Sequence, residues 1–347
     1  MKVWMLGVPS TFGGGDTERG HTALLWRRAG IEVTCLYFTS CSCGTTPKVP
    51  EKSNPWIGRL REAGVEFVAA DPDRLYEVDG LEGSIVSVIC HPHGLHNWEK
   101  LCALKCKLVW SPCMTVPSLS ESVFTRAPAP KAIHFQSRYQ ANQLVGEYRA
   151  IGCREFRLIR GAFEPLPFNP RPYRPGAPFV VGRLARPART KWSPYIWDML
   201  AAARRGGVDV RALCQGWSDK LTEHCGPPPD WAEVLPPDTL SAEEFLGRCH
   251  AMICPNWGIS ENWPRVGLEA MSAGVPLVVD GSGGWPEMVG DVAVTCQTMG
   301  EYPPAIVKLA TDDGFRQTTI PKGRERALKI SSPEVISRQW TDLFESL

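Results

Sequence analysis

At 347 residues, the chain is longer than most single hydrophobic cores, which favours two domains. The net charge of +1 and the pI of about 7.5 give no reason to expect nucleic acid or an anionic membrane surface as the partner, although a local patch can still bind either. No apolar run reaches the roughly 20 residues of a membrane span, and the N-terminus lacks a signal-peptide pattern, so we expect a soluble, cytoplasmic protein.

The cysteines favour a reduced protein without a metal site. There are 13, an odd number, and they are spread along apolar segments, including Cys90, Cys153 and Cys249. We therefore expect reduced, buried thiols. Cys41-x-Cys43 and the pair four residues apart at 102 and 106 lack the paired spacing of a zinc site.

The first half alternates apolar strands with helices, which predicts a doubly wound parallel sheet. Expected strands are Lys2–Val8, Ile31–Phe38, Val65–Ala70, Ser84–Cys90, Lys107–Trp110, Ala132–Phe135 and Phe156–Ile159, and expected helices are Asp16–Ala29, Ile57–Ala63 and Tyr139–Ala150. The stretch Phe38–Trp56 is predicted to be a long loop, and we regard it as a candidate part of an acceptor site.

Three glycines, Gly13, Gly14 and Gly15, stand between the first strand and the first helix. Missing side chains there let backbone amides approach a ligand, although a glycine-rich turn without a ligand is also consistent with the sequence. The spacing does not fit G-x-G-x-x-G, because Glu18 occupies the position of the third glycine. A dinucleotide-dependent oxidoreductase is therefore not expected.

Three histidines follow the strand that ends at Cys90, in the order His91, His93 and His96. Ligands bind at the carboxyl ends of strands in open α/β sheets, so this is a candidate site. His-x-His on a turn without a neighbouring Cys or carboxylate supports a metal only weakly, and we expect none.

The second half repeats the strand and helix alternation after a proline-rich stretch, Glu164–Pro178, that we read as an interdomain linker. Expected strands are Phe179–Gly182, Val208–Cys214, Trp231–Leu235, Ala251–Cys254 and Pro276–Val279, and expected helices include Ser241–Cys249, Tyr302–Thr311 and the final segment Ser332–Leu347. After the first of these strands come Arg183 and, eight positions later, Lys191, two cations that suit a diphosphate unless they form only a basic surface turn.

The stretch from Ile253 to Val279 contains the strongest candidates for ligand-binding residues. An apolar strand leads into a polar loop that contains Glu261, and a short helix that starts near Pro264 contains Glu269 and stops at Gly274. The start of this helix offers unpaired backbone N–H groups to a phosphate. Two carboxylates on either side of an anion site suggest a sugar nucleotide.

ENWPRVGLE, followed by AMSAGVPLVV and GGWPEMVG, resembles the E-x7-E motif of retaining GT-B glycosyltransferases, in particular glycosyltransferase family 4. The resemblance implies an α/β GT-B fold, in which two Rossmann-like domains with doubly wound parallel sheets face a cleft. The implied divisions are an acceptor-side domain (1–165), a linker (166–178), a nucleotide-sugar domain (179–330) and a C-terminal helix (331–347) that crosses back to the first domain.

The resemblance also implies roles for individual residues. Glu261 would contact the donor sugar, Glu269 the nucleotide ribose, and His93, or His91 as second choice, the sugar from the opposite wall. Arg183 and Lys191 would hold the diphosphate. Further donor contacts are implied for the glycine loop Gly13, Gly14 and Gly15, for the motif residues Asn262, Trp263 and Arg265, and, near the base, for Leu235 and Pro236.

The implied reaction is transfer of a hexose, with retention of configuration, from a UDP-sugar such as UDP-glucose to a hydroxyl group. Neither a metal nor a cofactor is expected. The acceptor can be a glycan, a lipid-linked sugar, a small molecule, a protein or a hydroxymethylated base in DNA. A nucleotide-sugar epimerase of the same fold and a non-catalytic nucleotide-sugar-binding protein are the alternatives.

Overall fold

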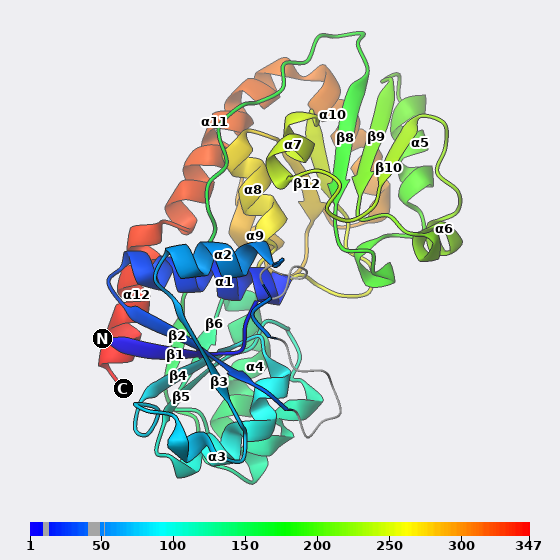
Figure 1. The fold of residues 1–347 in the computed structure, drawn as a ribbon. Helices are drawn as coiled ribbons and strands as arrows, with labels where there is room; N and C mark the ends of the chain where they lie inside the picture. Colours follow the sequence, from blue (N-terminus) through cyan, green and yellow to red (C-terminus); the bar gives the residue numbers. More distant parts are fainter. Residues whose placement is uncertain (10–13, 41–48, 52) are drawn as a thin grey trace. The chain divides into compact units, whose positions relative to one another are not determined.

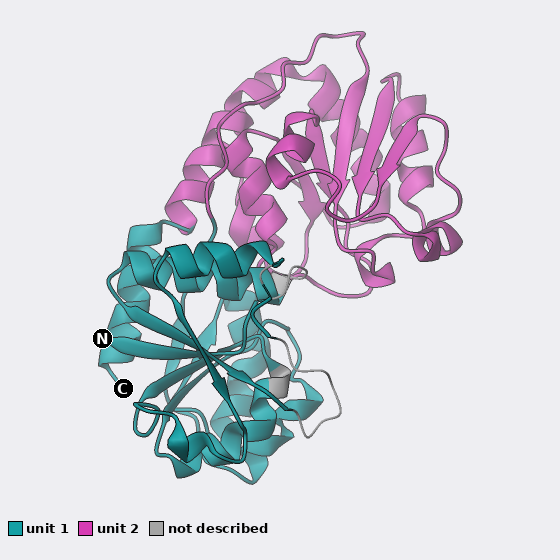
Figure 2. Cartoon of the chain, in the orientation of Figure 1, with its two compact units in different colours: residues 1–163, 331–347 teal, residues 164–330 magenta. Residues whose placement is uncertain are grey.

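The computed structural model describes residues 1–9, 14–40, 49–51 and 53–347. The chain forms two compact units, one of Met1–Phe163 with Ser331–Leu347 and one of Glu164–Ile330 (Figure 2). Gly13 and residues 41–48 and 52 of the predicted loop 38–56 lie outside the described residues. Within the described part, no helix is long and apolar enough to cross a bilayer.

Unit 1 is built on a seven-stranded parallel sheet of order β3-β2-β1-β4-β5-β6-β7 (Figure 1). Its strands are β1 (Lys2–Leu6), β2 (Glu32–Phe38), β3 (Glu66–Ala70), β4 (Ile85–Ile89), β5 (Lys107–Ser111), β6 (Ala132–Phe135) and β7 (Phe156–Leu158). Its helices are α1 (Gly14–Arg28), α2 (Pro55–Glu62), α3 (Trp98–Ala103), α4 (Arg138–Ala150) and α12 (Pro333–Glu345), with short 3₁₀ turns η1 (Leu75–Glu77), η2 (Pro92–Asn97) and η3 (Leu119–Thr125).

Successive side chains of a strand point to opposite faces of the sheet, so the residues of β1 pack in two separate hydrophobic cores. Val3 and Met5 pack in one core with residues of α1, α2 and α12, while Trp4 and Leu6 pack in the other with residues of α3 and α4. The C-terminal helix belongs to the first core, where Trp340 meets Trp26 edge to face at 5.0 Å between ring centroids. Residues from both ends of the chain thus complete unit 1.

Unit 2 repeats the arrangement with a six-stranded parallel sheet of order β10-β9-β8-β11-β12-β13. Its strands are β8 (Phe179–Leu184), β9 (Val210–Gln215), β10 (Ala232–Leu235), β11 (Ala251–Cys254), β12 (Leu277–Asp280) and β13 (Val294–Cys296). Its helices are α5 (Ile196–Arg205), α6 (Asp219–Cys225), α7 (Ala242–Gly247), α8 (Arg265–Ala273), α9 (Trp285–Val289), α10 (Tyr302–Thr311) and α11 (Asp313–Ile330), with 3₁₀ turns η4 (Arg189–Lys191) and η5 (Met299–Glu301).

The predicted fold class is confirmed, since both sheets are parallel and doubly wound. In each sheet the strand order reverses beside the first strand of the unit, between β1 and β4 and between β8 and β11. Ligands of such sheets bind outside the carboxyl ends of the strands at this switch point. The topology alone therefore selects the segments after β1, β4, β8 and β11 as candidate sites.

The stretch 164–178 contains neither helix nor strand and belongs to unit 2. Its backbone is fixed to that unit: the amide of Leu166 donates to Ser272 Oγ at 3.0 Å, and the amide of Asn169 donates to the carbonyl of Ala273 at 3.1 Å. Arg324 of α11 donates to the carbonyl of Leu166 at 3.1 Å. This proline-rich stretch is thus an ordered covering of α8 and α11.

One pair of cysteines lies close enough in space to form a disulfide. Parallel neighbours β4 and β5 end side by side, which brings the Cα atoms of the residues that follow them, Cys90 and Cys113, within 5.2 Å of each other. Cys153, Cys249 and Cys254 are free and buried, as expected.

His134 of β6 makes the stability of unit 1 depend on pH. Its Nδ1 lies 2.9 Å from Ser111 Oγ and its Nε2 2.7 Å from the carbonyl of Ile159, while Trp340 lies 4.5 Å away between ring centroids. Burial lowers the pKa of His134 from an ordinary value of about 6.5 to about 4. The fold therefore holds the neutral imidazole, and the unfolded chain binds the proton more tightly.

We expect the free energy of unfolding to be fully retained above pH 6.5 and to decrease as the pH falls from 6.5 towards 4. His134 alone accounts for about 2 kcal/mol of this decrease between pH 7 and pH 5. Denaturant titrations at both pH values should show a smaller decrease in His134→Asn than in the wild type. Exposed His96 provides the control, and a His96→Asn protein should keep the wild-type difference. An unaltered pH dependence in His134→Asn would contradict this assignment.

Candidate functional site

At the switch point of unit 2, two of the predicted site residues, Lys191 and Glu261, lie in contact. Arg183 lies in β8, Lys191 ends the η4 turn that follows it, and Glu261 lies in the loop after β11. The Lys191 ammonium donates to the Glu261 carboxylate at 2.5 Å. Their side chains are 18% and 22% exposed, so the ion pair is largely shielded from water but remains at the surface. A charge pair in such a position is strengthened by the reduced dielectric.

Arg183 is more deeply placed than the sequence suggests. It is only 4% exposed, its guanidinium donates to the carbonyl of Lys191, and it lies 5.6 Å from the ring of Trp192. These contacts fix the backbone that carries Lys191. In the structure, Lys191 is therefore the more accessible of the two predicted phosphate-binding cations.

The second motif carboxylate, Glu269, lies in α8, one turn after Arg265 at the start of the helix. Burial raises the pKa of Glu269, and the positive charge of Arg265 opposes that effect. Asn262 and Trp263, between the two glutamates, are buried. The helix ends as predicted at Gly274, which adopts the left-handed conformation at φ 85°.

The turn Gly281–Gly284 packs directly against the backbone of the loop that contains Glu261. The amide of Gly284 donates to the carbonyl of Glu261 at 2.7 Å. A Cβ on Gly284 would lie 1.6 Å from the carbonyl oxygen of Asn262, and one on Gly283 would lie 2.4 Å from that of Glu261. Only glycine permits this backbone approach. Sequence reasoning did not predict this contact, because it joins two segments that are separated along the chain.

Near the end of β10, the predicted base-site residue Leu235 is tied to the adjacent strand. Its carbonyl accepts the amides of Gly216 at 3.0 Å and Trp217 at 2.9 Å. A Cβ on Gly216 would lie 1.7 Å from the carbonyl of Ala185, so three loops converge here at the carboxyl edge of the sheet. Leu235 and Pro236 thus remain candidates for the region that holds a base.

The switch point of unit 1 carries the remaining predicted residues. Gly14 and Gly15 begin α1, and a Cβ on Gly15 would lie 2.7 Å from Cβ of Cys90, so a glycine is needed where α1 meets the end of β4. The ring of His91 is half-buried over Gly7, whose Cβ would lie 2.9 Å from its Nε2. His93 lies in η2, but its side chain is outside the described part.

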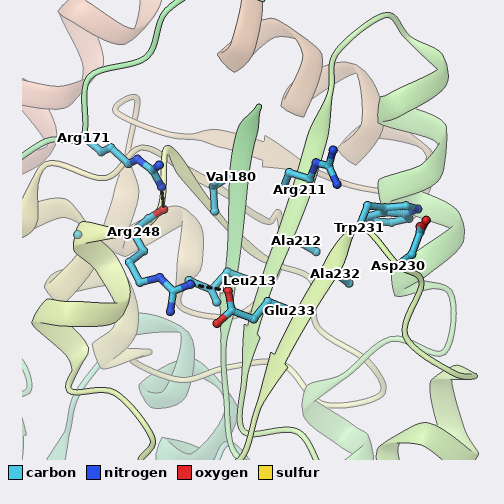
Figure 3. A pocket seen from close by; sticks show the side chains of 11 residues that line it. Arg171, Val180, Arg211, Ala212, Leu213, Asp230, Trp231, Ala232, Glu233 and Arg248 are labelled. Atoms are coloured by element: carbon cyan, nitrogen blue, oxygen red, sulfur yellow. Dashed lines mark hydrogen bonds and ion pairs between the residues drawn. The ribbon is translucent and has the colours of Figure 1, made fainter. Parts of the chain in front are cut away.

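A cavity of about 480 Å³ lies elsewhere on unit 2, near the amino ends of β8, β9 and β10 (Figure 3). Four of its five charged side chains have partners: Arg248 pairs with Glu233, Arg171 donates to the carbonyl of Arg248, and Arg211 lies 3.4 Å from Asp209. None of the predicted site residues lines this cavity. In the described part of the chain, no group of three or more His, Cys, Asp or Glu side chains is placed to hold a metal.

No family model matches the chain, and no curated protein matches it in sequence. Solved structures do match its fold. HepE from Anabaena, solved with UDP-glucose, matches with a TM-score of 0.73 at 15% identity over 100% of both chains. Sucrose-phosphate synthase from Thermosynechococcus elongatus matches with a TM-score of 0.70 at 15% identity over 100% of this chain and 98% of that one. A glycosyltransferase from Rickettsia africae matches with a TM-score of 0.69 at 11% identity, over 99% of this chain and 98% of that one. The chain has the GT-B fold.

Proposed function

We propose that the protein is a glycosyltransferase that uses a UDP-sugar, such as UDP-glucose, as its donor. The observation that carries this proposal is the Lys191–Glu261 ion pair at the switch point of unit 2. A cation suited to a diphosphate and a carboxylate suited to sugar hydroxyls meet where sheets of this type bind ligands. The full-length match to HepE, a structure solved with UDP-glucose, supports the same choice of donor.

In the proposed reaction, the bond between the anomeric carbon and the β-phosphate oxygen breaks as a bond from the acceptor oxygen to the same carbon forms. The acceptor proton passes to the departing diphosphate. Lys191 neutralises the charge that develops on the leaving group, and Glu261 orients the sugar through its hydroxyls. The step needs no oxidant and no cofactor, and we propose retention of configuration and independence from metal.

We assign the ribose to Glu269, which α8 holds one turn inside its own amino-terminal end. A half-buried carboxylate with a raised pKa loses solvation when it ionises, and ribose hydroxyls would supply hydrogen bonds in place of water. Glu269→Ala should therefore weaken nucleotide binding. The removal of a charge-assisted hydrogen bond predicts a roughly tenfold to hundredfold weaker affinity.

The test is a thermal-shift screen with UDP, UDP-glucose, GDP and ADP. A ligand of the folded state raises the melting temperature in proportion to RT ln(1 + [L]/Kd). We expect a shift with UDP that decreases in Glu269→Ala, each measured against the ligand-free melting temperature of the same protein. Glu325→Ala, an exposed position on α11, should keep the full shift. A wild-type protein that responds to none of these nucleotides would contradict the proposed function.

A further inference from the structure

An exposed aromatic pair links the same two segments of unit 2 as the Lys191–Glu261 ion pair. Tyr195 is 54% exposed, and its ring meets that of half-buried Trp257 at 5.5 Å between centroids and an interplanar angle of 74°. Ile259, in the same loop as Trp257, is 37% exposed. Large apolar side chains gathered at a protein surface commonly mark a binding site.

The aromatic pair lies on the same two chain segments as the ion pair of the candidate donor site. Tyr195 lies four residues after Lys191, and Trp257 lies four residues before Glu261. The two segments are therefore joined twice, once by the ion pair and once by the two rings. Because four residues span at most about 14 Å, a ligand group on the rings would lie within one or two sugar units of a donor sugar held at Glu261.

The backbone at Tyr195 is held by hydrogen bonds to a buried residue. Trp192 and Ser193 are fully buried, the amide of Tyr195 donates to Ser193 Oγ at 3.2 Å, and the amide of Ile196 donates to the carbonyl of Ser193 at 3.1 Å. Tyr195 immediately precedes α5 as its N-cap residue. A ring presented by a fixed backbone loses little conformational entropy when a ligand stacks on it, so preorganisation favours binding.

We infer that Tyr195 and Trp257 form a stacking subsite for a pyranose ring of a glycan acceptor; this inference rests on the proposed function. The two rings meet nearly at a right angle and form an apolar corner. A pyranose presents an apolar C–H face with hydroxyls around its rim, and an aromatic face is slightly negative and attracts such C–H groups. A sugar in the corner would keep its hydroxyls free for transfer. The acceptor is thereby assigned to the carbohydrates.

The test uses saturation-transfer NMR on the UDP-loaded protein with maltotriose, cellotriose and tri-N-acetylchitotriose as probes. We expect the ring C–H protons of at least one probe to receive saturation, and the affinity for it to weaken about tenfold in Tyr195→Ala. Tyr195→Phe keeps the ring and should keep the signal. Tyr76→Ala, at a 70% exposed tyrosine of unit 1, provides the control. The UDP-induced thermal shift should be the same in all four proteins.

Each other outcome has a definite meaning. If no probe receives saturation while UDP still shifts the wild type, the stacking subsite is overturned and the donor site is not. If Tyr195→Ala diminishes the UDP shift, the rings serve the donor, and the acceptor assignment is wrong. If the wild type sediments as an oligomer that Tyr195→Ala dissociates, a second copy of the chain covers the pair, and the proposal is again overturned.

Discussion

Replacement of Glu261 by glutamine should reduce sugar transfer by about 10²-fold to 10³-fold while leaving UDP binding intact. Glutamine keeps the size of the side chain but removes the charge that faces Lys191 at 2.5 Å. In the proposed complex, the carboxylate orients the sugar and the ammonium meets the diphosphate. Loss of the carboxylate therefore affects the transferred group more than the nucleotide.

The assay measures UDP released from UDP-glucose in the presence of the three trisaccharides, with EDTA added because we propose a metal-independent reaction. Glu233→Gln is the matched control, since it also removes the carboxylate of a glutamate–cation ion pair on unit 2, here with Arg248, but lies at the distant cavity. It should retain full activity. Undiminished turnover in Glu261→Gln would show that this carboxylate has no role in transfer, and loss of all wild-type activity with EDTA would refute metal independence.

The fold could be predicted from the sequence because most strands are short apolar runs between clear stop signals. Predicted segments such as Ala251–Cys254, Ala132–Phe135 and Tyr302–Thr311 agree with the structure residue for residue. The long helix α11 was not predicted. It contains Pro321, a residue that normally ends a helix, and its apolar residues do not fall on one stripe.

Candidate site residues can be proposed from motif spacing, whereas the environment of their side chains cannot. Spacing along the chain marks Glu261 and Lys191 as candidates, but their ion pair depends on β8 and β11 being neighbours in the sheet. The burial of Arg183 beneath the carbonyl of Lys191 is likewise a tertiary feature. The contact between Tyr195 and Trp257 has no signal in either segment alone.

Substitution of Gly284 by alanine should have the second large effect, although glycine has no side chain that could contact a substrate. Its φ of −81° suits any residue, so the cost of a side chain is purely steric. The added Cβ would lie 1.6 Å from the carbonyl oxygen of Asn262, within a backbone that cannot move without carrying Glu261 along. A displacement of about 1 Å at a positioned group can cost about 10²-fold in rate, and we expect a loss of that size in transfer.

The same overpacking should lower the free energy of unfolding by about 1 to 3 kcal/mol. Gly247→Ala is the control, because a Cβ at that position in α7 meets nothing within 4 Å. It should leave transfer unchanged and stability equal or slightly higher, since alanine favours a helix. Circular dichroism and melting curves establish that Gly284→Ala is folded before its rate is compared. If a folded Gly284→Ala protein transfers sugar at the wild-type rate, the position of the Glu261 loop does not control the reaction, and the contact serves packing alone.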